Sequence, residues 1–183
     1  TCKKINEDKI DQHLSKSING KYPLGAIPDK QSDIDKVFVY SPVSGRLAVT
    51  PSQFALAIPP VANQSPKGSC VSFSVGYYMY STTYYYGKQA QLYDVAVNIF
   101  SPEYLYNNVN ITHNCSDGSA LISNLEFLLT SGDVLYATMP YDPFGSCALP
   151  AVNPEAAKYK IGAYSSVAST DIAAVKNFLY SEK

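Results

Sequence analysis

Residues 63–74 read Asn-Gln-Ser-Pro-Lys-Gly-Ser-Cys-Val-Ser-Phe-Ser, and this stretch is the most informative part of the sequence for predicting the fold. A polar loop of turn-forming residues leads here into a helix, because aromatic residues recur at steps of three and four from Phe73 to Tyr84. The sequence predicts a helix over 70–86 with Cys70 in its first turn. The positive end of a helix stabilises a thiolate and lowers the pKa of the thiol, so Cys70 is a candidate nucleophile. Its position alone leaves the alternative of an inert packing cysteine open.

Three further helices are expected downstream. Ser101-Pro102-Glu103 has the composition of a helix start, since serine caps and proline suits the first helical position. The next helix should begin at a cap on Ser116 or Asp117 and end at Gly132. A last helix is expected over 170–180. In the helix that ends at Gly132, the expected buried residues are Leu121, Ile122, Leu125, Leu128 and Leu129. In the helix over 170–180, they are Ile172, Val175, Phe178 and Leu179.

The remaining segments are read as extended chain or short elements. Strands are expected over 36–40 and 158–164, and a short helix is expected after Asn153. Residues 1–20 are polar with a thin apolar stripe, which is typical of a short surface helix or a loosely held arm.

Composition excludes two classes of protein. The 183 residues carry 14 basic and 15 acidic side chains, so the net charge of -1 lacks the electrostatic footprint of a nucleic-acid-binding protein. Residues 68–87 carry no charge, but 12 of these 20 residues have a hydroxyl group, which argues against a membrane span.

Five motifs in order carry a resemblance to a known family. Gln64 stands six residues before Cys70, and the Gly-Ser-Cys entrance to the helix follows it. Ser101-Pro102-Glu103-Tyr104-Leu105, Cys115-Ser116-Asp117-Gly118, Met139-Pro140-Tyr141 and residues 160–164 come next. Together these segments resemble the papain-like cysteine proteases over about residues 58 to 180.

The resemblance implies a set of site residues and an activity. Cys70 would attack a peptide carbonyl, and the Gln64 amide would donate to the resulting oxyanion together with the Cys70 N–H group. Asp117, Gly118 and Ser119 would bind the extended substrate backbone. The expected partner is a peptide or protein substrate, with no cofactor and no metal ligand set.

The sequence departs from the family pattern near the nucleophile. The family has a cysteine three residues before the nucleophile and a tryptophan after it, where this chain has Lys67 and Val71. Cys115 and Cys147 both lack the partner that the family pattern would give them. A disulfide between these two cysteines is open as a guess, and it would be worth roughly 3 to 4 kcal/mol.

The family's catalytic histidine and asparagine are expected about 130 to 150 residues after the cysteine, which is beyond Lys183. Of the two histidines present, His113 lies in a polar loop, where it is more often solvated than catalytic. The expected fold is therefore α+β and papain-like: an N-terminal extension (1–57), a helical domain with the nucleophile (58–150) and the start of a β-rich second domain (151–183), truncated before the catalytic histidine. Such a chain alone should be inactive, and should associate with its missing C-terminal portion or another copy, or use the extension before Pro59 as a cover.

Two questions stay open at this point. Cys2, followed by Lys3-Lys4, resembles the lipidated start of an exported bacterial lipoprotein of the cell envelope, with an ordinary exposed thiol as the alternative. The departures from the family pattern also leave room for a catalytically inactive papain-like binding or scaffold module.

Overall fold

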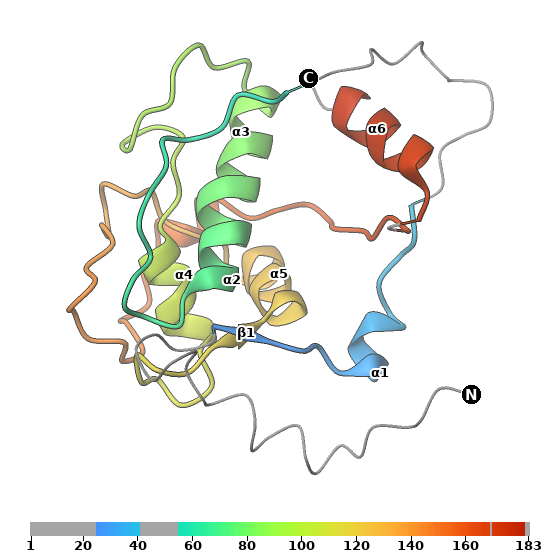
Figure 1. Cartoon of the computed structure of the whole chain (residues 1–183). Helices are drawn as coiled ribbons and strands as arrows, with labels where there is room; N and C mark the ends of the chain where they lie inside the picture. Colours follow the sequence, from blue (N-terminus) through green and yellow to red (C-terminus); the bar gives the residue numbers. More distant parts are fainter. Residues whose placement is uncertain (1–24, 41–54, 169, 182–183) are drawn as a thin grey trace.

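The computed structural model describes residues 25–40, 55–168 and 170–181, and Figure 1 shows helices grouped around one long central helix. In chain order the elements are β1 (Ala26–Ile27), α1 (Gln31–Ile34), α2 (Cys70–Ser72), η2 (Phe73–Tyr80), α3 (Ser81–Gly87), α4 (Pro102–Val109), β2 (Ser119–Ala120), α5 (Leu121–Thr130), η3 (Ala156–Lys158) and α6 (Ile172–Ser181). Within the described ranges, none of these helices has the length and hydropathy that a bilayer crossing requires. The predicted stripe in 1–20 and Cys2 lie outside the described residues.

The helix predicted to start at Cys70 is confirmed as one continuous helix made of α2, η2 and α3. Its middle part, η2, is π-helical and therefore wider than an α-helix. Gly76 lies there against the Asp133 side chain, whose Oδ2 would be 3.2 Å from a Cβ atom at this position. The Ser81 hydroxyl donates to the Gly76 carbonyl at 3.2 Å and accepts the Phe100 N–H at 3.0 Å. These contacts tie the widened part of the helix to the following segment.

Helices α4 and α5 pack against the central helix (Figure 1). The predicted start of α4 is confirmed, because the Ser101 hydroxyl accepts the Tyr104 N–H at 2.9 Å and Pro102 is the first helical residue. The main core cluster consists of Val75, Tyr80, Phe100, Leu105, Leu125, Leu128 and Leu135. A second cluster consists of Phe73, Tyr77 and Ile99. The tyrosine stripe of the central helix is therefore core, as its spacing predicts.

The start of α5 differs from the prediction, and its end agrees with it. The residue before α5 is Ala120, which has no capping group, and Asp117 instead accepts hydrogen bonds from Thr112 and Asn114 inside its own loop. Both predicted caps are therefore wrong. Leu121 is also wrongly predicted as buried, since it is 47% exposed. Gly132 has a φ of +86°, as predicted for a residue that ends a helix.

The strand predicted over 158–164 is wrong. The Ile161 N–H donates to the Leu128 carbonyl at 3.2 Å, and the Tyr159 carbonyl accepts the Asp133 N–H at 3.1 Å. Carbonyl groups in the last turn of a helix need partners from outside the helix. The backbone of this segment is used for that purpose at the end of α5, and it forms no ladder. The short helix expected after Asn153 is present as η3.

The strand predicted over 36–40 reduces to one bridge between Val39 and Ser166. This bridge is parallel and joins the segment after α1 to the segment before α6. The Tyr40 ring contacts Phe178 of α6 at 5.8 Å between centroids. The segment around 36–40 thus serves as a support for the last helix.

Helix α6 is present where it is predicted, but its predicted buried face is wrong. Ile172 is 66% exposed, and Phe178 and Leu179 are also exposed, while Ala174 is 1% exposed. The helix stands to one side of the body in Figure 1, and its residues do not belong to the described core clusters. Periodicity identified the apolar face of α6, but burial depends on what lies opposite.

No β-rich unit forms within the described residues of the predicted second domain, which contain η3, the Ser166 bridge and α6. The mixed secondary structure is consistent with the α+β class. The division at residues 57 and 150 stays a prediction, and so does truncation before a catalytic histidine. The described sheet consists of β1 and β2, which pair in parallel with Ala26 opposite Ser119 and Ile27 opposite Ala120.

Candidate active site

Cys70 is half-buried at the first residue of α2, directly after the loop that contains Gln64. Gln64 is half-buried, and its backbone carbonyl accepts a hydrogen bond from the Tyr141 hydroxyl. Ser69, the residue before Cys70, is fully buried, and its hydroxyl lies 3.2 Å from the same Tyr141 hydroxyl. One phenol group therefore contacts both ends of the loop that leads to the cysteine.

The loop also contains a buried charge. Lys67 Nζ donates to Glu103 Oε1 of α4 at 2.5 Å, and the two side chains are 1% and 4% exposed. Nζ also lies 5.4 Å from the centre of the Tyr141 ring, in the geometry of a cation–π contact. Asn107, one turn further along α4, donates to the same Glu103 oxygen at 3.2 Å. A buried ion pair with such partners anchors the loop to α4.

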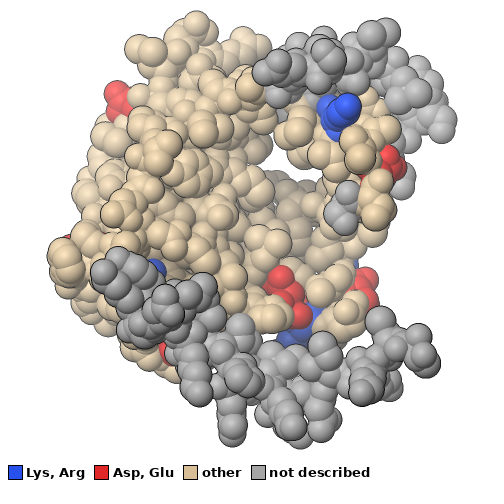
Figure 2. Space-filling view, in the orientation of Figure 1, with Lys and Arg blue, Asp and Glu red and all other residues tan. Residues whose placement is uncertain are grey.

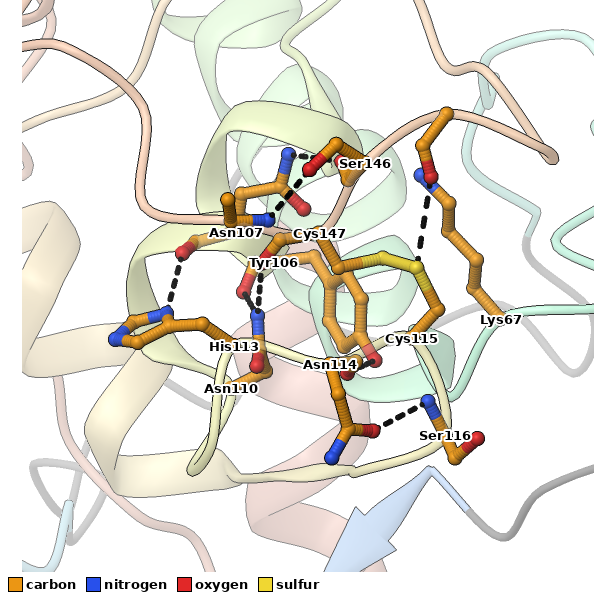
Figure 3. The surroundings of a disulfide bond; sticks show 12 residues. Lys67, Tyr106, Asn107, Asn110, His113, Asn114, Cys115, Ser116, Ser146 and Cys147 are labelled. Atoms are coloured by element: carbon orange, nitrogen blue, oxygen red, sulfur yellow. Dashed lines mark hydrogen bonds between the residues drawn. A yellow bond between two sulfur atoms is a disulfide. The ribbon is translucent and has the colours of Figure 1, made fainter.

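Figure 3 shows the disulfide between Cys115 and Cys147 with Lys67 beside it. The two Cα atoms are 5.3 Å apart, and the cysteines are separated by 32 positions in the sequence. The disulfide between Cys115 and Cys147, which the sequence analysis left open, is therefore present. Lys67 stands where the family pattern has a cysteine, and here an ion pair holds the position while Cys115 is bonded elsewhere.

The segment predicted to bind substrate, Asp117 to Ser119, lies beside this loop. The Gly68 N–H donates to the Cys115 carbonyl at 3.0 Å, which joins the two loops. The Asp117 carbonyl accepts the Tyr106 hydroxyl at 2.5 Å, while its carboxylate stays within its own loop. Gly118 and Ser119 are buried.

A buried polar network connects this segment to the helix of the cysteine. The Ser72 hydroxyl of α2 donates to Asn124 Oδ1 at 2.7 Å. Asn124 Nδ2 donates to the Ser119 hydroxyl at 2.9 Å and to the Ala120 carbonyl at 2.8 Å. Because these side chains are buried and paired, they fix the distance between β2 and α2. The structure thus places all five predicted site residues around one helix end.

Gly25 and β1, from the predicted N-terminal extension, lie against Cys70 and the segment 117–119. The Ser119 N–H donates to the Gly25 carbonyl at 3.0 Å, and β1 continues the pairing. A Cβ atom on Gly25 would lie 2.8 Å from Cys70 Sγ and 2.4 Å from the Gly68 carbonyl oxygen, and one on Gly118 would lie 2.4 Å from the Gly25 carbonyl oxygen. Two glycines are required because three backbone segments meet here. Figure 1 shows β1 passing close to the end of the helix that begins with α2.

The cover changes the chemistry of the thiol. Burial raises the pKa of Cys70, and hydrogen bonding from the backbone of Val71, Cys70 and Gly25 lowers it by less. The expectation of a lowered thiol pKa is therefore wrong for this arrangement. The backbone at the helix end does favour the thiolate, but the burial of the thiol is the larger effect.

His113, the one histidine within the described ranges, lies in an exposed loop with its Nδ1 3.1 Å from the Asn107 carbonyl oxygen. Its φ is +54°, a conformation seen in tight loops. The described residues contain no cluster of histidine, cysteine or acidic side chains that could hold a metal ion. Charged side chains are sparse on the face shown in Figure 2, in keeping with a charged fraction of 16%.

Sequence reasoning missed three contributors to the site. Tyr141 appeared only as part of a motif, Lys67 only as a departure, and Gly25 not at all. Lys67 is the one charged residue between Arg46 and Lys88, and this isolation was a signal for a buried partner. Nothing in the sequence near Gly25 indicated that it would meet Cys70.

The structure is similar to solved structures of cysteine proteases. Xylellain, a cysteine protease from Xylella fastidiosa, matches with a TM-score of 0.66 and 25% identity over 87% of this chain. The bromelain protease from Ananas comosus, in complex with the E64 inhibitor, matches with a TM-score of 0.41 and 19% identity over 59% of this chain and 44% of its own. No protein-family model and no curated protein matches the chain. The chain spans 63% of the length of the xylellain chain, and this similarity to a cysteine protease agrees with the resemblance that the residues around Cys70 carry.

Proposed function

We propose that this protein is a cysteine peptidase in which Cys70 is the nucleophile. The observation that carries the proposal is the meeting of Cys70, the Gln64 loop and the Gly118–Ser119 backbone at one helix end, in a fold similar to that of xylellain. The Cys70 thiolate attacks a peptide carbonyl, and the Gln64 amide and the Cys70 N–H group donate to the oxyanion. The backbone of residues 117–119 binds the extended substrate.

The general base in this proposal lies beyond Lys183. Support comes from the share of the xylellain chain that is matched, 63%, and from the position of His113 in an exposed loop where it contacts a backbone carbonyl. A thiol of raised pKa without a base is a poor nucleophile at neutral pH. The 183-residue chain alone should therefore hydrolyse no peptide.

The segment from Gly25 to Asp29 acts in this proposal as a cover that substrate must displace. It already uses the Ser119 N–H, which an extended substrate would need. Asp29 Oδ1 accepts the Ile122 N–H at 2.7 Å and so anchors the far end of the cover on α5. Removing residues 1–29 from the full-length protein should increase the rate of peptide hydrolysis. An unchanged or lower rate in a folded protein would contradict this role.

The nucleophile is tested by substitution in the full-length protein. Cys70→Ala should abolish peptide hydrolysis, and Gln64→Ala should reduce the rate about a hundredfold to a thousandfold, because one oxyanion donor is worth about that much. His113→Ala is the control and should leave the rate unchanged. Equal and small effects of Cys70→Ala and Gln64→Ala would favour the alternative, an inactive papain-like binding or scaffold module.

Export to an oxidising compartment is part of the same proposal. The disulfide between Cys115 and Cys147 supports it, since structural disulfides are rare in the reducing cytosol. Attachment of a lipid to Cys2 would place the protein at the bacterial cell envelope. Mass spectrometry of the N-terminal peptide from native material tests this, and an unmodified Cys2 would contradict the anchor.

A further inference from the structure

Tyr141 contacts both ends of the loop that leads to Cys70. Its hydroxyl donates to the Gln64 carbonyl and lies 3.2 Å from the Ser69 hydroxyl. Gln64 is the proposed oxyanion donor and Ser69 is bonded directly to Cys70. A single hydroxyl group therefore sets the separation between the residue that carries the amide and the residue that precedes the nucleophile.

The ring of Tyr141 is itself held from two sides. Phe73 packs on it edge-to-face with a centroid distance of 4.8 Å, and Lys67 Nζ lies 5.4 Å from its centre. Lys67 cannot move freely, because its charge is buried and paired with Glu103 at 2.5 Å. The ring position is thus fixed from the helix of Cys70 and from α4 at the same time.

The chemistry of an oxyanion site depends on such fixed positions. Donors stabilise a developing negative charge most when they already point to it and need no reorganisation during the reaction. The six-residue loop from Gln64 to Ser69 would otherwise have many conformations, and each would aim the Gln64 amide differently.

We propose that Tyr141 is a positioning residue that acts through Gln64, with the Lys67–Glu103 ion pair holding its ring. The inference rests on the proposed peptidase function and adds a residue to it. The two parts of the Tyr141 side chain have separate contacts. The ring packs on Phe73 and Lys67, and the hydroxyl contacts Gln64 and Ser69. Tyr141→Phe removes the hydroxyl and keeps the ring.

Tyr77 offers a matched control. It is a buried tyrosine whose ring also contacts Phe73, at 5.7 Å, and whose hydroxyl donates to a backbone carbonyl, that of Pro60, at 2.9 Å. The Pro60 carbonyl precedes the Gln64 loop, so Tyr77→Phe loses a comparable hydrogen bond without touching that loop. Both variants should lower the thermal midpoint of unfolding by similar amounts.

The experiment measures kcat and KM of peptide hydrolysis in the full-length protein. Tyr141→Phe should reduce kcat about tenfold with little change in KM, since a misaimed oxyanion donor affects the transition state more than substrate binding. Tyr77→Phe should leave kcat within about twofold of the parent. In a Gln64→Ala background, Tyr141→Phe should have no further effect on kcat, because the donor that it positions is absent.

The failures of the two proposals can be told apart. Hydrolysis that survives Cys70→Ala overturns the peptidase itself. If Cys70→Ala is inactive but Tyr141→Phe and Tyr77→Phe reduce kcat equally, or if Tyr141→Phe and Gln64→Ala are additive, the positioning role is overturned. If Tyr141→Phe does not fold, Ser69→Ala removes the other contact of the hydroxyl. That variant should also reduce kcat in the parent and not in the Gln64→Ala background, and additivity there counts against the proposal in the same way.

Discussion

Cys70 lies between two walls of different construction. The inner wall consists of the loop before Cys70, α4 and the 115–119 segment, and it is held by a disulfide, a buried ion pair and the Ser72–Asn124–Ser119 network. The outer wall is the segment 25–29, which is held by a two-residue parallel pairing and the Asp29 contact to α5. Short pairings of this kind have little independent stability. We therefore expect the segment 25–29 to be displaced more easily than the inner wall.

The largest effect is expected from the ion pair of the inner wall. Lys67→Ala leaves Glu103 buried without its partner, which should lower the free energy of unfolding by about 3 to 5 kcal/mol. Urea unfolding measures the loss. The control is Lys88→Ala, because Lys88 also lies over a tyrosine ring, at 5.5 Å, but is exposed. A loss of less than about 1 kcal/mol in Lys67→Ala would show that the loop is held by something else.

The disulfide is the next largest contribution. Replacing Cys115 and Cys147 together by alanine should cost about 3 to 4 kcal/mol, because the cross-link shortens the unfolded chain across 32 positions. Thermal or urea unfolding with and without a thiol reductant measures it. The reductant should destabilise the parent and leave the double variant unchanged. Destabilisation of the double variant by reductant would mean that the cost has another origin.

A pH dependence is expected from Asp133, whose buried carboxyl lies against Gly76 of the central helix. Burial raises the pKa of this carboxyl well above its ordinary value, and the Val134 N–H opposes the shift by less. The folded state therefore binds the proton more tightly than the unfolded state, so stability should fall as the pH rises through the ordinary carboxyl pKa toward the folded one. In Asp133→Asn, the midpoint of unfolding should depend less on pH over that range. A midpoint that falls equally steeply in this variant would assign the effect to another group.

The smallest effect on stability should come from the outer wall, together with the largest change in access to Cys70. A methyl group on Gly25 would meet the Gly68 carbonyl oxygen at 2.4 Å and Cys70 Sγ at 2.8 Å, so Gly25→Ala should lift β1 away. The unfolding free energy should change by about 1 kcal/mol or less. Burial raises the pKa of Cys70 by more than the Gly25 backbone hydrogen bond lowers it, so opening the site to water should lower the pKa even though that hydrogen bond is lost. The pH profile of alkylation by iodoacetamide should therefore move to lower pH, and the rate at neutral pH should rise.

The control for this experiment is Gly162→Ala, since no atom lies within 4 Å of a Cβ at Gly162. In that variant, iodoacetamide should alkylate Cys70 at the same rate as in the parent at every pH. If Gly25→Ala also keeps the parent rate and profile, the segment 25–29 does not limit access to the thiol, and the two walls are equally permanent.

Local sequence patterns were enough to predict those elements whose signals act within a few residues. The helix at Cys70, the Ser101 cap and the Gly132 end were predictable, because side-chain periodicity and capping act within a few residues. The resemblance of residues 63–74 to the active-site segment of papain-like cysteine proteases also implied a cysteine-protease fold, and the xylellain structure is similar to this chain.

Which residues contact one another and become buried depends on the fold of the whole chain. The segment 158–164 has the composition of a strand, yet its Ile161 N–H donates to the Leu128 carbonyl of α5 and its Tyr159 carbonyl accepts the Asp133 N–H. Leu121 and Ile172 lie on faces that their helices are predicted to bury, yet both are exposed. Gly25 reaches Cys70 across 45 positions of sequence, and the burial of the thiol raises its pKa although the helix end and the Gly25 backbone act in the opposite direction. Burial and desolvation are properties of several distant segments together, so no local pattern encodes them.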